Sequence, residues 1–149
     1  MPVTDHQIAT LRAQLTGRID EHRRLLSQMD IATANQYLSL ATAAFFEAAL
    51  RRFVRDGSPV DDAEIIEFVT SVRLRLGDPD DLDAQTAETL IKIAVEKLPV
   101  EAQNGISADA ANGTRIILLS GMVGDLDLTP DQLEEFLHAA RRMTDTAFA

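Results

Sequence analysis

The sequence predicts an all-α fold: a single-domain bundle of five or six helices, formed by residues 1–149 around a central apolar helix. One observation is a helix-start pattern that occurs three times, at residues 3–8, 60–65 and 128–133. In each copy a Thr or Asp can accept a hydrogen bond from the backbone N–H three residues on, where a Gln or Glu can reach back. The other is that apolar residues recur at helical spacings through most of the chain. A chain of this length can bury a substantial core, and it contains no cysteine to add a disulfide.

The first helix is predicted to run from about Asp5 to Gln28. Its apolar side chains fall at spacings of three, four and seven and form one face: Ile8, Leu11, Leu15, Ile19, Leu26 and Met29. Gly17 lies in the middle and costs about 1 kcal/mol relative to alanine, so the packing of this face must hold the helix together. Asp30 can cap a following helix, although a continuous or kinked helix through this region also fits.

The second helix is predicted over about Ile31 to Arg55. Its segment from Tyr37 to Leu50 is apolar or small almost all the way round, which indicates a helix buried in the middle of the fold. Gly57 and Pro59 follow it and mark its end. This segment is the predicted central element.

Four further helices are predicted, over about residues 62–76, 82–98, 108–123 and 130–147. Residues 114–120 are β-branched enough for a strand, but no partner strand is evident, so the segment is assigned to a helix. Gly121 and Gly124 at the end of this helix are interpreted as close-packing or terminating positions.

The charge distribution argues against nucleic acid as a ligand. The net charge is −10, and residues 58–149 carry seven Lys and Arg against eighteen Asp and Glu. Such a surface repels a phosphate backbone. The longest nearly uncharged stretch has 14 residues, which is too short to span a bilayer. The absence of cysteine and of a basic, then apolar, leader favours the cytoplasm.

Metal and cofactor sites are not predicted. Glu135 and His138 have the spacing of a di-iron motif, but one such pair is insufficient, and both should point to solvent. The acidic runs at residues 78–83 and 125–129 lack the glycine of a calcium loop and are explained by helix N-termini. His6 lies in a helix cap and is expected to be exposed.

Three residues are candidates for a small-molecule site. Glu47 is the only charge between Asn35 and Arg51, and an acid in that setting can have a raised pKa and serve as a general acid or base. An ordinary ion pair with Arg51, four residues later, is the simpler interpretation. Tyr37 and His22 could add polar groups to an interhelical pocket near Glu47, with His22 on the apolar face of the first helix.

The leading functional hypothesis is a non-enzymatic interaction module that forms a homodimer or binds a protein partner. Its predicted interface is the apolar face of the first helix: Ile8, Leu11, Leu15, Ile19, His22 and Leu26. The acidic remainder of the chain would complement a basic partner. The alternative is a small-molecule-binding or enzymatic bundle with the pocket near Glu47.

Overall fold

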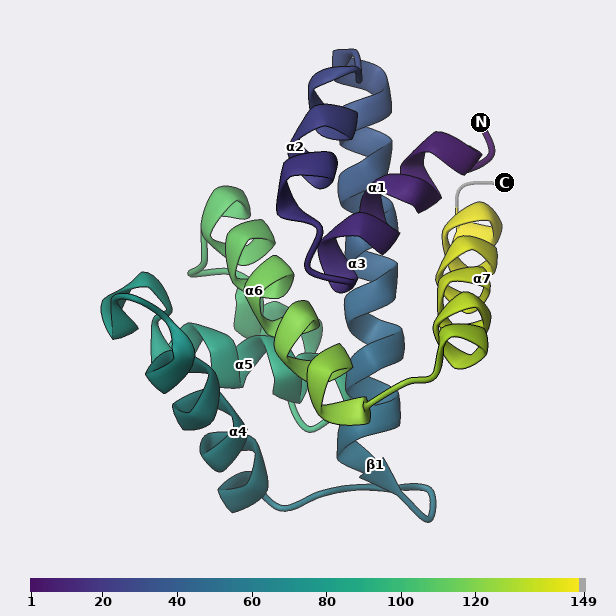
Figure 1. Cartoon of the computed structure of the whole chain (residues 1–149). Helices are drawn as coiled ribbons and strands as arrows, with labels where there is room; N and C mark the ends of the chain where they lie inside the picture. Colours follow the sequence, from purple (N-terminus) through teal and green to yellow (C-terminus); the bar gives the residue numbers. More distant parts are fainter. Residues whose placement is uncertain (148–149) are drawn as a thin grey trace. The chain divides into compact units, whose positions relative to one another are not determined.

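The structure, a computed structural model, describes residues 1–147, and this part of the chain contains seven α-helices and one pair of two-residue strands (Figure 1). The prediction of an all-α fold is confirmed. The number of helices exceeds the predicted five or six. The chain divides into two compact units, one formed by Met1–Glu47 with the residues from Asp127 onward and the other by Ala48–Leu126. The assignment of both units to a single domain stays a prediction.

The first unit contains α1 (Asp5–Leu15), α2 (Ile19–Ser27), most of α3 (Ile31–Phe53) and α7 (Pro130–Ala147). The prediction of one helix from Asp5 to Gln28 is wrong, because the chain breaks between α1 and α2. Gly17 adopts a φ of +76° there, in the left-handed region that glycine enters at little cost. The sequence pattern predicted that Gly17 would only weaken one continuous helix. In the structure, the chain instead leaves the helix at this glycine.

Two histidines join α1 to α2 reciprocally. His6 of α1 has Nε2 2.9 Å from the carbonyl oxygen of Leu25, and His22 of α2 has Nδ1 2.9 Å from the carbonyl oxygen of Thr10. Each ring nitrogen donates to a carbonyl of the opposite helix. The expectation that His6 is exposed is wrong, since this side chain is half-buried between the two helices.

The three predicted helix starts are observed, with one difference. Thr4 and Thr129 each form a complete capping box, in which Gln7 and Gln132 reach back to the cap residue's N–H. Asp61 accepts from the N–H of Glu64 at 3.1 Å, but the Glu64 side chain does not return to Asp61. It binds two arginines instead, because a hydrogen bond between two oppositely charged groups is stronger than one from a neutral amide to a carboxylate.

The second unit contains the end of α3 and the following elements: β1 (Val54–Arg55), β2 (Ser58–Pro59), α4 (Asp62–Arg75), η1 (Pro79–Asp81), α5 (Ala84–Ala94), η2 (Val100–Gln103) and α6 (Ala108–Leu126). Its core is formed by completely or almost completely buried side chains from four helices: Phe53, Ile65, Leu90, Ile91, Leu118, Leu119 and Met122. The helical assignment of residues 114–120 is confirmed, since they lie within α6.

The two strands were missed by the sequence analysis. Asp56 and Gly57 connect them with φ values of +53° and +78°, the conformation of a type I′ hairpin turn. The Asp-Gly dipeptide is the usual signal for that turn. As a result, α3 ends at Phe53 rather than at the predicted Arg55.

The helix predicted over residues 82–98 is observed as α5, which is shorter at both ends: it begins at Ala84 and ends at Ala94. Asp83 is its cap and accepts from the Thr86 N–H at 2.9 Å. After α5 the chain turns at Glu96, which has a φ of +63°. By contrast, α7 has the predicted bounds. The Tyr37–Leu50 segment of α3 is mainly buried, as predicted, apart from Leu50, which is 42% exposed.

Candidate ligand-binding site

A pocket of about 410 Å³ lies in the first unit between α1 and α7. Its lining residues come from both helices: Asp5, Ile8 and Arg12 from α1, and Glu134, Leu137, His138 and Arg141 from α7. Pockets that hold small ligands or a partner's side chain typically measure about 300–1,000 Å³. The volume is therefore sufficient for one long side chain or a small molecule.

The two helices contribute the same residue pattern to this pocket. Each supplies an acid, an aliphatic residue three positions later and an arginine seven positions after the acid. This spacing keeps the three side chains on one helix face. The aliphatic members, Ile8 and Leu137, are 7% and 1% exposed and form an apolar floor.

The acid of each helix pairs with the arginine of the other. Arg12 donates to Glu134 from Nε at 2.8 Å and from Nη2 at 2.6 Å, which makes a two-bond fork. Arg141 donates from Nη1 to Asp5 at 2.9 Å and from Nη2 to the Val3 carbonyl oxygen at 2.6 Å. These reciprocal pairs fix α1 and α7 in antiparallel register, since the partner number falls as the residue number rises.

The Arg12–Glu134 pair perturbs the acidity of both groups. The hydrogen bonds from the guanidinium hold the pKa of Glu134 below its usual value, with the positive charge of Arg12 as a further cause. The same hydrogen bonds raise the pKa of Arg12, against a smaller opposing effect of burial. Both groups therefore stay ionised at neutral pH.

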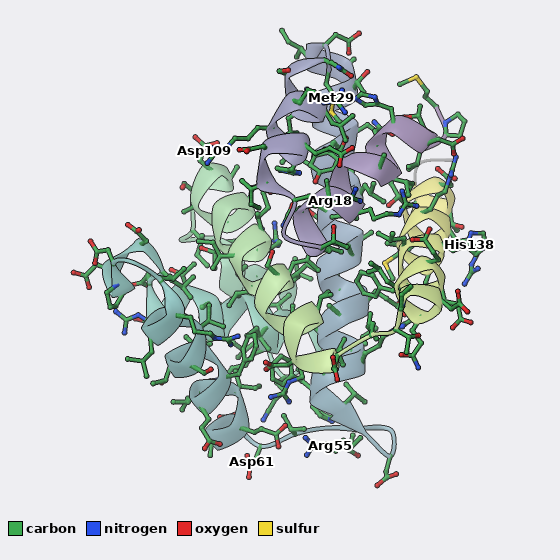
Figure 2. The ribbon with its side chains drawn as sticks, viewed as in Figure 1. Arg18, Met29, Arg55, Asp61, Asp109 and His138 are labelled. Atoms are coloured by element: carbon green, nitrogen blue, oxygen red, sulfur yellow. The ribbon has the colours of Figure 1, made fainter. Side chains whose placement is uncertain are left out.

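The negative members of these ion pairs are the more exposed ones. The Asp5 and Glu134 side chains are 98% and 53% exposed, whereas the Arg12 and Arg141 side chains are both 32% exposed. His138 lies beside them and projects from α7 into solvent (Figure 2). A molecule that approaches the pocket consequently meets carboxylates first.

The structure does not bring the three predicted small-molecule residues together. Tyr37 and His22 are neighbours, with ring centroids 6.2 Å apart, and the Tyr37 hydroxyl donates to Gln14 Oε1 at 3.3 Å. Burial raises the pKa of Tyr37, so it stays a neutral phenol. Glu47 lies ten residues further along α3, about 15 Å away along the helix axis. The polar groups that share a pocket are those on α1 and α7 instead.

The predicted interface residues are divided by the break at Gly17. Leu11 and Ile8 are buried, Leu15, His22 and Leu26 are half-buried, and Ile19 is 44% exposed. Ile8 and Leu11 therefore pack inside the unit, and Ile19 of α2 is the member of the predicted face that is open to solvent. Self-association through these residues stays a prediction.

Other candidate sites can be placed on the structure. Glu135 and His138 are both exposed, as predicted from their position on α7. Within residues 1–147, the His, Asp and Glu side chains form no group of three or more that is placed to hold a metal ion. No helix in this part of the chain has the length and apolar character needed to cross a bilayer.

Lowering the pH should weaken the Arg12–Glu134 pair. It should thereby remove the difference in the free energy of unfolding between the wild type and Glu134→Gln. Because the pKa of Glu134 is lowered in the folded state, the unfolded chain takes up its proton first as the pH falls through the usual value of 4.5. The pair's contribution is complete well above pH 4.5 and is lost progressively as the pH falls through 4.5 and then through the lower pKa of the folded state. As a largely exposed pair it is worth at most about 1 kcal/mol. Thermal unfolding between pH 7 and pH 3 measures this difference, with Glu135→Gln as the control that leaves the pocket intact. A difference that persisted unchanged at the acid end would contradict the assignment.

Comparison with known proteins identified no relative of this chain. No family model, curated protein or solved structure matches the chain.

Proposed function

We propose that this chain is a non-enzymatic helical interaction module that binds a basic segment of a protein partner at the α1–α7 pocket. The observation that supports this proposal is the arrangement of charge around the pocket. Two carboxylates, Asp5 and Glu134, stand outermost above the apolar floor of Ile8 and Leu137. A lysine or arginine side chain matches both features, because its aliphatic stem can cover the floor while its charged end reaches the rim.

The greater exposure of the carboxylates at the pocket favours a cation over an anion. Each Glu134 oxygen accepts one N–H from Arg12, and a carboxylate oxygen can accept more than one hydrogen bond. Both terminal nitrogens of Arg141 are already engaged, with Asp5 and the Val3 carbonyl. A cationic ligand can add to these carboxylates, whereas an anionic ligand would approach the exposed carboxylates of Asp5 and Glu134 before it reached the less exposed arginines.

The net charge of the whole chain acts in the same direction. At −10 it attracts positively charged partners over distances beyond direct contact and accelerates their encounter, with an effect that salt reduces. Two copies of the chain, in contrast, repel each other at long range. The predicted homodimer therefore requires short-range contacts through exposed apolar side chains such as Ile19 and Ile31. Light scattering over a concentration series at two salt levels distinguishes a stable dimer from a monomer.

Fluorescence anisotropy with three labelled peptides tests the proposal. The peptides share one amphipathic sequence in which the charged positions carry lysine and arginine, glutamate, or glutamine. The basic peptide should bind, with affinity that falls as salt rises, and the other two should not. Asp5→Lys reverses the charge at the most exposed rim position and should weaken binding, while Asp131→Lys makes the same change outside the pocket. Equal binding of basic and acidic peptides, or equal loss in both variants, would refute the proposed function.

The small-molecule hypothesis and the cytoplasmic location stay predictions. A small ligand near Glu47 would need polar groups other than Tyr37 and His22, because Tyr37 lies about 15 Å from Glu47 along α3 and His22 is its neighbour. Glu47 itself is half-buried. Binding of a neutral small molecule that Glu47→Gln abolishes, with folding intact, would favour that alternative.

A further inference from the structure

We infer that Asn104 is a site of spontaneous chemical modification, at which the side-chain amide is converted into a carboxylate. The chain contains two Asn-Gly pairs, Asn104-Gly105 and Asn112-Gly113. Asparagine is a thermolabile residue, and a following glycine, which has no side chain, leaves it most open to attack by the next backbone nitrogen. The structure places the two pairs in different surroundings, and it exposes only the first to this reaction.

The nucleophile of this reaction is the backbone nitrogen of the glycine. After a base has removed its proton, this nitrogen attacks the side-chain carbonyl carbon (Cγ) of the asparagine. A new N–C bond closes a five-membered succinimide ring, while the bond to the amide nitrogen breaks and this nitrogen takes up a proton and leaves as ammonia. One water molecule then opens the ring at either carbonyl. The products are aspartate and isoaspartate, in which the main chain continues through the side-chain carboxyl group.

The Asn104-Gly105 pair exposes both reacting groups. It lies in the turn that connects η2 to α6, and both residues are exposed to solvent. Within residues 1–147, neither the Gly105 N–H nor the Asn104 side chain makes a hydrogen bond. The attacking nitrogen and the leaving amide are therefore accessible to base and water.

The turn at Asn104 can open at little cost. Asn104 has a φ of −58° and a ψ of −27°, so its Cα–C bond must rotate before the Gly105 nitrogen faces Cγ. In the described part of the chain, one backbone hydrogen bond of this turn spans the rotating bond, from the Ile106 N–H to the Gln103 carbonyl oxygen at 2.9 Å. Exposed turns with so few hydrogen bonds open locally at low free energy.

The Asn112-Gly113 pair is protected by α6. Both residues lie inside this helix, where the Gly113 N–H belongs to the helical hydrogen-bond ladder. Asn112 is half-buried, and its Oδ1 accepts from Arg115 Nη1 at 3.5 Å. Attack at Asn112 requires the helix to open around it, so the fold selects Asn104 from two pairs of identical local sequence.

Modification of Asn104 changes a connection within the second unit. It adds one negative charge to a chain whose net charge is already −10, and isoaspartate also adds one carbon atom to the main chain. The preceding residue, Gln103, accepts from Arg115 Nη2 at 2.9 Å and thereby holds η2 to α6. The isoaspartyl form consequently alters the turn next to this contact.

Incubation of the full chain in water enriched in oxygen-18, followed by peptide mass spectrometry, tests the inference. A peptide modified during the incubation gains about 3 Da rather than about 1 Da, because the ring-opening water supplies the new oxygen. The Asn104 peptide should be modified at least about tenfold faster than the Asn112 peptide, since a helix opening that costs about 1.4 kcal/mol already gives this ratio. The rate at Asn104 should rise with pH, because the attacking nitrogen must lose its proton. In the urea-unfolded chain, both peptides should react at similar rates.

A matched pair of variants identifies the nucleophile. Gly105→Ala and Gly113→Ala each add a methyl group where no atom lies within 4 Å, and neither glycine has a positive φ. Both variants should therefore fold, which circular dichroism verifies. Gly105→Ala should slow the modification of Asn104 severalfold, because the methyl group obstructs the approach of the nitrogen. Gly113→Ala should leave the rate at Asn104 unchanged.

Three results would overturn the inference. Equal rates at Asn104 and Asn112 in the folded chain would show that the fold does not select the site. An unmodified Asn104 in the folded chain, when both pairs react in urea, would show that the turn protects it. An unchanged rate in Gly105→Ala would show that the exposed glycine nitrogen does not control the reaction.

Discussion

Gly121→Ala is expected to lower the free energy of unfolding by about 1–2 kcal/mol, although alanine is the better helix former. A Cβ atom on Gly121 of α6 would lie 2.9 Å from Val72 Cγ2 and 3.3 Å from Phe68 Cζ, both on α4. Val72 is β-branched and buried, so its methyl group has little freedom to move away. The clash in the packed α4–α6 contact outweighs the gain of up to about 1 kcal/mol from helix propensity.

Gly124→Ala is the matched control for this substitution. Gly124 lies one turn later in α6, and an added Cβ there would meet no atom within 4 Å. This variant should gain about 0.5–1 kcal/mol from helix propensity alone. Urea unfolding of both variants measures the difference, which should be about 2 kcal/mol in total with an unchanged denaturant slope. Equal stabilisation of both variants would show that α4 and α6 do not approach closely at Gly121.

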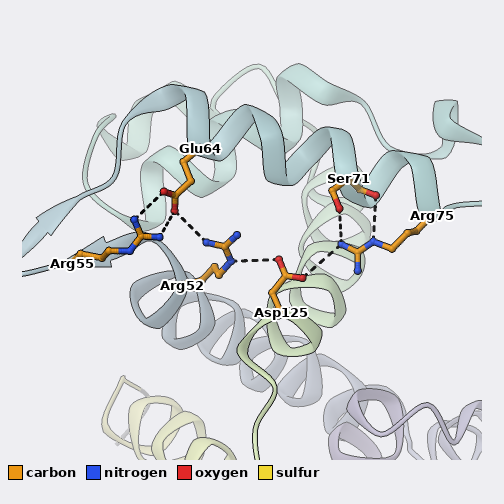
Figure 3. A network of polar contacts seen from close by, with 6 residues as sticks. All are labelled: Arg52, Arg55, Glu64, Ser71, Arg75 and Asp125. Atoms are coloured by element: carbon orange, nitrogen blue, oxygen red, sulfur yellow. Dashed lines mark hydrogen bonds and ion pairs between the residues drawn. The ribbon is translucent and has the colours of Figure 1, made fainter.

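Arg52→Met should cost about 2 kcal/mol of folding free energy, because Arg52 joins three helices of the second unit (Figure 3). Its Nη1 donates to Glu64 Oε2 at 3.2 Å, and its Nε donates to Asp125 Oδ2 at 3.4 Å. The guanidinium also lies over the Phe53 and Phe68 rings, 4.9 and 5.6 Å from their centroids. Methionine retains most of the apolar packing but loses both charge pairs and the cation–π contacts.

Arg55→Met is the corresponding control on the same carboxylate. Arg55 makes the shorter hydrogen bonds to Glu64, at 2.6 and 2.9 Å. These bonds are the largest cause of the lowered pKa of Glu64. It is nevertheless 63% exposed, whereas Arg52 is 23% exposed. Solvent screening and side-chain entropy reduce the contribution of an exposed pair to less than about 1 kcal/mol. Thermal and urea unfolding compare the two variants, and a larger loss in Arg55→Met would contradict this ranking.

The elements that follow from local chemistry were predictable from the sequence. Thr4, Asp61 and Thr129 cap helices as the pattern indicated, and α7 has the predicted bounds. The two glycines were predicted to be close-packing or helix-terminating positions. Gly121 is a close-packing position, whereas Gly124 belongs to α6 and has no atom within 4 Å of an added Cβ. The caps and the helix bounds depend on residues within a few positions of one another, whereas the close packing at Gly121 involves Val72 and Phe68 of α4.

The features that were missed depend on backbone conformation or on distant pairing. The positive φ at Gly17 is allowed rather than required by glycine, so periodicity alone favoured one long helix. The α1–α7 pocket joins residues more than 120 positions apart. One signal for this pocket was present in the sequence: an acid, an aliphatic residue and an arginine occur at equal spacing in α1 and in α7. Equal spacing predicts two faces that can pair antiparallel, but not that they meet.

The reciprocal ion pairs between α1 and α7 also bear on how the first unit is assembled. They connect residues separated by 122 and 136 positions, so each closes a loop of more than 120 residues. Closing a loop of this length costs conformational entropy, and a fold that depends on such distant contacts forms more slowly than one built from local contacts. During synthesis, the pocket-lining groups of α1 have no α7 to meet until the more than 100 residues between the two helices have been made. The pocket is therefore completed only after that intervening segment, and a binding site there reports that α1 and α7 have come together.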